Sequence, residues 1–175
     1  MTSPSAIAVS PPGAWLRRAL GPLDHLVTAL LLFAVAVMVA VVSMQVGLRY
    51  GFNRSIDWAD EIGRLAFVWS IFLAIPLGVR QGSHIGIDLL VDKLPGAAQV
   101  ALRRAGAVLG ALMMFAITWA SARVAAEQWD ELMATVDWSV GWFIVPVGLG
   151  AALSGLHLVH IAIAGPPERK LVEAE

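Results

Sequence analysis

The chain contains 175 residues, of which 58% are hydrophobic and 14% are charged, whereas ordinary soluble domains have about 25% charged residues. Its formal net charge of −1 offers no basic surface for the phosphates of nucleic acids. Because the sequence contains no cysteine, disulfides, thiolate metal sites and cysteine nucleophiles are excluded. The composition therefore excludes a soluble domain and a nucleic-acid-binding protein, and it predicts an integral membrane protein.

Four apolar segments approach the roughly 20 residues with which an α-helix crosses the hydrocarbon core of a bilayer. They predict an all-α integral membrane protein with four transmembrane helices. The expected parts are an N-terminal cytoplasmic tail at 1–22, a four-helix membrane domain at 23–164 with spans at about 26–48, 58–79, 103–126 and 140–164, and a C-terminal cytoplasmic tail at 165–175. The first apolar segment is longer than the core of a signal peptide and lacks a small-residue cleavage site, so we expect it to be retained.

An amphipathic pattern follows the second span. Polar residues recur there at every fourth position, at Arg80, His84, Asp88 and Asp92. Apolar residues fill most positions between them, which predicts an interfacial amphipathic helix at about 83–94, between the second and third spans, that ends before Pro95. The polar stripe is interpreted either as the solvated face of that helix or as a catalytic histidine–aspartate pair. The second interpretation lacks a recognisable nucleophile or metal-ligand motif.

Lysine and arginine are unevenly distributed between the two sides of the membrane. One side, which holds both termini and the connection between the second and third spans, has eight such residues, namely Arg17, Arg18, Arg80, Lys93, Arg103, Arg104, Arg169 and Lys170. The other side has Arg49, Arg54 and Arg64, with Arg123 near the membrane boundary. Since cytoplasmic loops carry the excess of Lys and Arg, both termini are predicted to be cytoplasmic.

The connection between the first two spans carries several charges. Asp57, as an N-cap, and Asp60 suit the start of the second helix, because the positive end of the helix dipole favours acidic side chains. Glu61 lies further inside that helix, where a charge is costly unless it is paired, hydrated or near the interface. We expect Glu61 to form a partly buried ion pair with Arg49, which ends the preceding span.

The same connection and its surroundings contain an ordered series of residues. The series consists of Gln45, Arg49, Tyr50, Asn53, Ser55, Trp58, Glu61, Arg80, His84, Asp88 and Pro95. In its order and its placement on the first two spans, it resembles the small membrane subunit of tripartite ATP-independent periplasmic (TRAP) transporters, the DctQ-like family. Pro146, near the start of the fourth span, fits the same resemblance.

The resemblance implies a non-enzymatic component of a secondary transporter in a bacterial inner membrane. In that family a periplasmic substrate-binding protein captures an organic acid, and a large permease subunit moves it with sodium. The small four-helix subunit associates with the large one. The resemblance thus implies two protein partners besides membrane lipid, and no cofactor in this chain. The sequence agrees in lacking the duplicated halves and broken helices from which many transporters build a midplane site.

The connection between the third and fourth spans is acidic. It contains Glu127, Asp130, Glu131 and Asp137, and no Lys or Arg occurs between residues 124 and 168. Trp129, Trp138 and Trp142 lie near these acids, and tryptophan is typical of the membrane–water boundary. The acids are interpreted either as a solvated loop or as a surface that docks the binding protein electrostatically.

Small residues in the last two spans predict close packing between helices. They are Gly106, Gly110 and Ala111 in the third span, and Gly148, Ala152 and Gly155 in the fourth.

Two other functions are weighed against the transporter subunit. A haem-carrying membrane anchor subunit of an oxidoreductase would hold iron between imidazoles, and all four histidines, His25, His84, His157 and His160, fall towards the cytoplasmic side. His157 and His160 share one helix face, however, so they cannot hold one iron from opposite sides. A stand-alone exporter of small cations would need acidic residues at mid-membrane depth, which the sequence lacks.

Overall fold

The computed structural model describes residues 14–81 and 95–165. In these residues four long helices, α1 (Ala14–Phe52), α2 (Asp57–Arg80), α4 (Gly96–Glu127) and α5 (Val145–Ala164), are accompanied by a short 3-10 helix, η1 (Val140–Phe143). Together with η1, the four helices are long and apolar enough to cross a membrane. The predicted all-α architecture with four spans is therefore confirmed. The interfacial helix expected at 83–94 lies outside the described residues.

The helix bounds follow the expected spans, with four differences. α4 begins at Gly96, seven residues before the expected start of the third span at 103, because Arg103 and Arg104 end the apolar run without ending the helix. α1 begins at Ala14, so it extends into the segment expected as a tail. Asp57 is the first residue of α2 and Ile56 is its N-cap, so Asp57 acts through the helix dipole and not as the expected cap. The fourth span starts as η1 and continues as α5 around Pro146, whose missing N–H is tolerated in a first helical turn.

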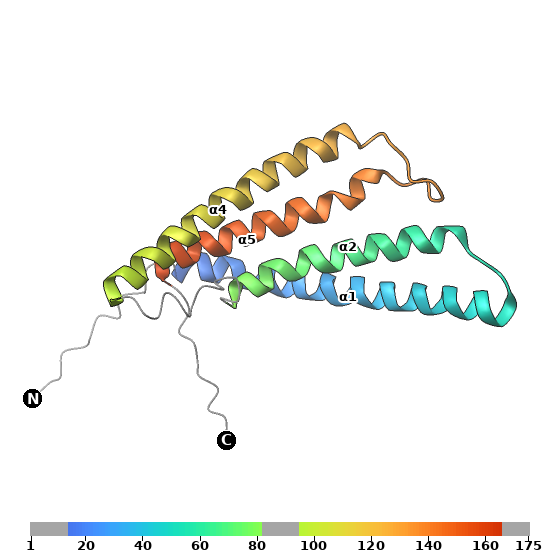
Figure 1. Ribbon diagram of the computed structural model, residues 1–175, viewed down its shortest axis with the longest axis horizontal. Coiled ribbons are helices and arrows are strands. Elements are labelled where there is room, and N and C mark those ends of the chain that lie inside the picture. The colour runs from blue at the N-terminus through green and yellow to red at the C-terminus, as the bar shows by residue number, and fades with distance from the viewer. Residues whose placement is uncertain (1–13, 82–94, 166–175) are drawn as a thin grey trace, which may run out of the picture.

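The helices form a row of two antiparallel hairpins (Figure 1). α2 and α5 pack against each other in the middle, α1 packs on α2, and α4 packs on α5. Of the residues in the most apolar stretch of each helix, 39% are buried in the inner helices α2 and α5, whereas 11% are buried in the outer helices α1 and α4. The loops at 53–56 and 128–139 lie at the same end of the molecule, which we call the loop end (Figure 1). Arg80 and Ala164 end their helices at the opposite end, which we call the base.

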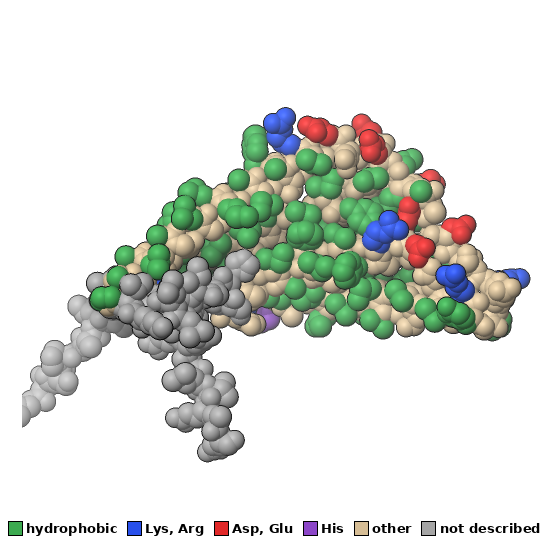
Figure 2. All heavy atoms as spheres, viewed as in Figure 1, with side chains coloured by type: hydrophobic (Ala, Val, Ile, Leu, Met, Phe, Trp, Pro, Cys, Tyr) green, Lys and Arg blue, Asp and Glu red, His purple; other side chains and the backbone are tan. Residues whose placement is uncertain are grey.

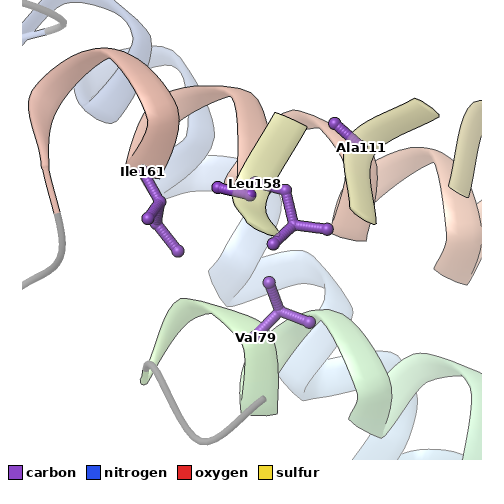
Figure 3. Close-up of a cluster of buried hydrophobic side chains, with 5 residues drawn as sticks. Val79, Ala111, Leu158 and Ile161 are labelled. Atoms are coloured by element: carbon purple, nitrogen blue, oxygen red, sulfur yellow. The ribbon is translucent and has the colours of Figure 1, made fainter. Parts of the chain in front are cut away.

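The apolar core lies near the base, where three helices meet. Val79 of α2, Ala107 and Ala111 of α4, and Leu158 and Ile161 of α5 form one buried cluster. Figure 3 shows Leu158 between Ala111 on one side and Val79 on the other. The small side chains of α4 let that helix approach α5, as expected for contacts in a membrane.

Glycines set the closest distances between the helices. An added Cβ would lie 3.1 Å from Leu158 at Gly110 and 3.1 Å from Phe115 at Gly155, so the predicted packing of both glycines is confirmed. At Gly106 nothing lies within 4 Å. The tightest position was not predicted from the sequence: a Cβ at Gly150 would lie 2.2 Å from the carbonyl oxygen of Phe72 in α2.

Gly150→Ala should destabilise the isolated chain in detergent, because its methyl group would collide with a backbone carbonyl that cannot rotate away. Overpacking of this kind costs about 1–3 kcal/mol. Gly78→Ala in α2 is the matched control, since nothing lies within 4 Å of its added Cβ. Thermal unfolding followed by tryptophan fluorescence should show a lower Tm for Gly150→Ala alone. Equal Tm values for the two variants would contradict the close contact.

Candidate functional site

Polar contacts join the helices at both the base and the loop end. Helices in lipid gain no hydrophobic free energy from meeting each other, so close packing and hydrogen bonds hold them together. The two ends therefore contain the side chains whose chemistry is most informative.

At the base, Asp24 links three helices. Its Oδ2 accepts a hydrogen bond from Nη1 of Arg80 at 3.0 Å, and its Oδ1 lies 2.9 Å from Nε2 of His157. These residues come from α1, α2 and α5. The side chains of Asp24 and His157 are 8% and 5% exposed, whereas that of Arg80 is 51% exposed. Two donors thus satisfy a buried carboxylate that would be costly to leave without partners.

Sequence reasoning missed this cluster. It placed Arg80 in the family series without assigning it a partner, and it left Asp24 just outside the first expected span. An acidic residue next to a long apolar run is itself a signal of a paired site. Its partner His157 lies 133 residues away in the chain, so no local pattern identifies it.

At the loop end, Glu61 of α2 holds the loop between α4 and η1. Its Oε1 accepts a hydrogen bond from the backbone N–H of Ala134 at 2.8 Å. Its Oε2 accepts from the N–H groups of Thr135 at 3.0 Å and Val136 at 3.1 Å, and also from the Thr135 hydroxyl. One carboxylate therefore binds three consecutive backbone N–H groups of another hairpin.

These partners of Glu61 differ from the one expected. Within residues 14–81 and 95–165 no ion pair joins Glu61 to Arg49, which is exposed in the last turn of α1. The neighbouring Asp60 contacts α1 instead, and its Oδ1 accepts from Nε2 of Gln45 at 2.8 Å. Successive helical residues point about 100° apart. A carboxylate one position after Asp60 therefore points away from α1 and towards the loop.

Tryptophans fix the same loop against α2. Nε1 of Trp69 donates to the carbonyl oxygen of Trp142 at 3.1 Å, and their ring centroids are 6.3 Å apart. The ring of Trp129 lies 5.9 Å from that of Trp142. Gly141 is required beside it, because a Cβ there would lie 2.7 Å from the Trp129 ring. Trp129 and Trp142 thus hold the loop in place in addition to any role as interfacial anchors.

The loop carries most of the predicted docking acids. Asp130, Glu131 and Asp137 are exposed on it, and Glu127 ends α4 with Arg123 at 3.9 Å. Figure 2 shows acidic side chains gathered at the loop end and apolar side chains along the helices. The loop closes on itself through hydrogen bonds from Met133 N–H to Trp138 C=O and from Val140 N–H to Glu131 C=O, both at 2.8 Å.

The remaining residues of the family series have structural positions of their own. Asn53, with φ of 50°, ends α1 in the left-handed conformation that asparagine tolerates. Three further residues of the series are exposed at or beside the loop at 53–56, namely Tyr50, Ser55 and Trp58. Pro95 is the N-cap of α4. His84 and Asp88 lie outside the described residues.

The contacts of His25 and His157 are structural in character. Across residues 14–81 and 95–165, no three His, Asp or Glu side chains are grouped as a metal site requires. Nε2 of His157 is directed at Asp24, and Nδ1 of His25 lies 2.8 Å from the carbonyl oxygen of Gly21.

Comparison with known proteins identifies a family. Residues 38–165 match the family model described as "Tripartite ATP-independent periplasmic transporters, DctQ component". A Haemophilus influenzae protein named as a TRAP transporter small permease protein is 40% identical over 68 residues, which cover 39% of this chain and 42% of that protein. The sialic acid TRAP transporter small permease protein SiaQ of Vibrio cholerae is 29% identical over 87 residues, 50% of this chain and 49% of that protein. The chain thus matches less than half the length of these two relatives.

A third relative is much longer. The isethionate TRAP transporter permease protein DctMQ of Oleidesulfovibrio alaskensis is 37% identical over 38 residues, which cover 22% of this chain and 6% of that protein.

Removing Asp24 and His157 singly and together should give strongly non-additive losses of stability. Each single change to alanine leaves buried polar groups without a partner, at a cost that reaches about 3–5 kcal/mol for a fully buried pair. The double variant loses less than the sum of the two. His25→Ala is the control partner, because its ring contacts Gly21 and not Asp24. Chemical denaturation in detergent measures all variants, and additive losses for Asp24 and His157 would contradict their coupling.

Proposed function

The chain belongs to the DctQ component family of tripartite ATP-independent periplasmic transporters, and we propose that it braces the large permease subunit of such a transporter and helps dock the periplasmic substrate-binding protein for sodium-coupled uptake of an organic acid. As a member of this family with four helices able to span a membrane, it is a multi-pass inner-membrane transport component and not an enzyme.

The bracing role is supported by the way the two hairpins are joined to each other at the base and at the loop end. Asp24 joins α1 to α2 and α5 at the base, and Glu61 joins α2 to the loop before η1. The outer helices keep most of their apolar surface free for lipid or a partner. A large partner is also supported by DctMQ, in which the 38 matched residues make up 6% of a permease chain.

The described helices favour a supporting role over a transport path of their own. α2 and α4 are continuous across their spans, and the fourth span changes from η1 to α5 only near the loop end. Transporters commonly build midplane sites from broken helices in paired repeats. The names of two relatives include different substrates, sialic acid and isethionate. We infer that the substrate is selected by the partners of this chain.

In this proposal the chain itself holds no cofactor. A haem anchor would need imidazole nitrogens free to bind iron from two helices. Nε2 of His157 lies instead 2.9 Å from Oδ1 of Asp24. The family membership likewise favours the transporter subunit over the oxidoreductase anchor.

We propose that the base faces the cytoplasm and the loop end faces the periplasm, because the excess of Lys and Arg lies on the side of the base. An impermeant thiol reagent should then label Ser55→Cys but not Gln81→Cys in cells with a permeabilised outer membrane. The native chain has no cysteine, so the background is clean. Labelling of Gln81→Cys alone would reverse the orientation.

Transport should require all three components. Liposomes that contain this chain alone should take up no organic acid under a sodium gradient. Adding the large permease and a substrate-loaded binding protein should produce uptake, which omission of this chain should abolish. Uptake by this chain alone, or full uptake without it, would overturn the supporting role.

Neutralising Glu127, Asp130, Glu131 and Asp137 to their amides should slow uptake by the complete complex at low salt and have less effect at high salt. Exposed charges steer the encounter of two proteins, and salt screens them. The amide variant of Asp57, an exposed acid at the start of α2, serves as a single-charge control. Undiminished uptake at every salt concentration would contradict the docking role of the four acids.

A further inference from the structure

We propose that Glu61 is the positioning residue of the loop at 128–139, which it holds in one conformation before the binding protein arrives. This inference rests on the proposed docking role of that loop. In this role Glu61 acts through its hydrogen bonds to the loop and not only through its negative charge.

The contacts of Glu61 are unusual for a side chain in an apolar helix. Both of its oxygens accept hydrogen bonds, and the donors are the N–H groups of Ala134, Thr135 and Val136 with the Thr135 hydroxyl. An ionised carboxylate has the lone pairs to accept several donors at once. Hydrogen bonds to an ionised acceptor are also stronger than bonds between neutral groups. The carboxylate therefore fixes the backbone of three consecutive residues.

The fixed segment lies between the exposed acids. Glu131 precedes residues 134–136 in the chain and Asp137 follows them directly. The Met133–Trp138 and Val140–Glu131 hydrogen bonds join the chain before this segment to the chain after it. Holding residues 134–136 at Glu61 therefore helps, together with the tryptophan contacts, to orient the whole loop on α2. A loop held in this way does not need to be ordered when a partner binds, and ordering costs affinity.

Asp60 provides a control within the same helical turn. Its carboxylate is exposed and contacts Gln45 of α1, whereas Glu61 contacts the loop. Asp60→Asn and Glu61→Gln remove the same charge from adjacent positions. Any difference between these variants therefore reports the contacts of Glu61 with the loop and not the net charge of the loop end.

The experiment uses the complete complex with its substrate-loaded binding protein. Glu61→Gln should raise the concentration of binding protein that gives half-maximal uptake by roughly three- to tenfold. The maximal rate at saturating binding protein should stay unchanged. Hydrogen exchange should be faster at the amides of residues 134–136 in this variant. Asp60→Asn should change neither quantity.

Each outcome decides the inference. Unchanged exchange at residues 134–136 would overturn the positioning role, whether or not the loop docks a partner. Faster hydrogen exchange with an unchanged half-maximal concentration of binding protein would show that the loop does not dock the binding protein, which would overturn the inference. In that case the variant with all four acids changed to amides would also transport normally. Equal effects of Asp60→Asn and Glu61→Gln on uptake would show that charge alone acts.

A second variant covers the case in which Glu61→Gln fails to assemble. Thr135→Val keeps the carboxylate and removes one of its donors, the hydroxyl group. It should produce the same changes in exchange and half-maximal concentration, with smaller size. Normal exchange and normal uptake in an assembled Thr135→Val complex would count against the positioning role.

Discussion

The buried carboxylate of Asp24 holds three of the four long helices together at the base. It is the one described acidic side chain within the base, and it draws donors from two other helices, Arg80 on α2 and His157 on α5. In a bilayer a charge in such a position is tolerated only when it is paired. The pairing requirement therefore brings α1, α2 and α5 together at the base, whereas α4 joins them through the apolar cluster that contains Ala107 and Ala111.

Between the polar contacts of the base and those of the loop end, close packing of small residues holds the helices together. Between the polar contacts at the two ends, α2 and α5 meet through backbone, with Gly150 against the carbonyl of Phe72. α4 reaches α5 through Ala107 and Ala111 beside Leu158. Small residues thus set the distances, and polar residues set which ends of the helices lie together.

The helices of this fold were predictable from the sequence, but the contacts between them were not. Apolar runs of sufficient length identified four spans, and α2 begins and ends within one residue of its expected bounds of 58–79. α1 and α4 start earlier than expected, because the length of an apolar run does not report where a helix continues into the polar interface. Gly110 and Gly155 were identified correctly as packing residues, since small residues in a span have few other uses.

The polar partners required knowledge of which helix faces which. The cost of burying Glu61 was recognised from its place inside a span, yet its partner depends on the direction in which that face of α2 points. Asp60 and Glu61 are adjacent in sequence and serve different hairpins. The Asp24–His157 contact joins the first and last spans, and only the folded row brings them together.

The single-layer row has a consequence for handling the protein outside its membrane. Four helices in a closed bundle hide one stripe each from their surroundings, whereas here α1 and α4 each have one principal neighbour. A purified chain must therefore be covered by more detergent for its mass than a closed bundle of equal length. Short-chain detergents that reach the flanks of α1 and α4 should loosen the contacts between the helices before they unfold any helix.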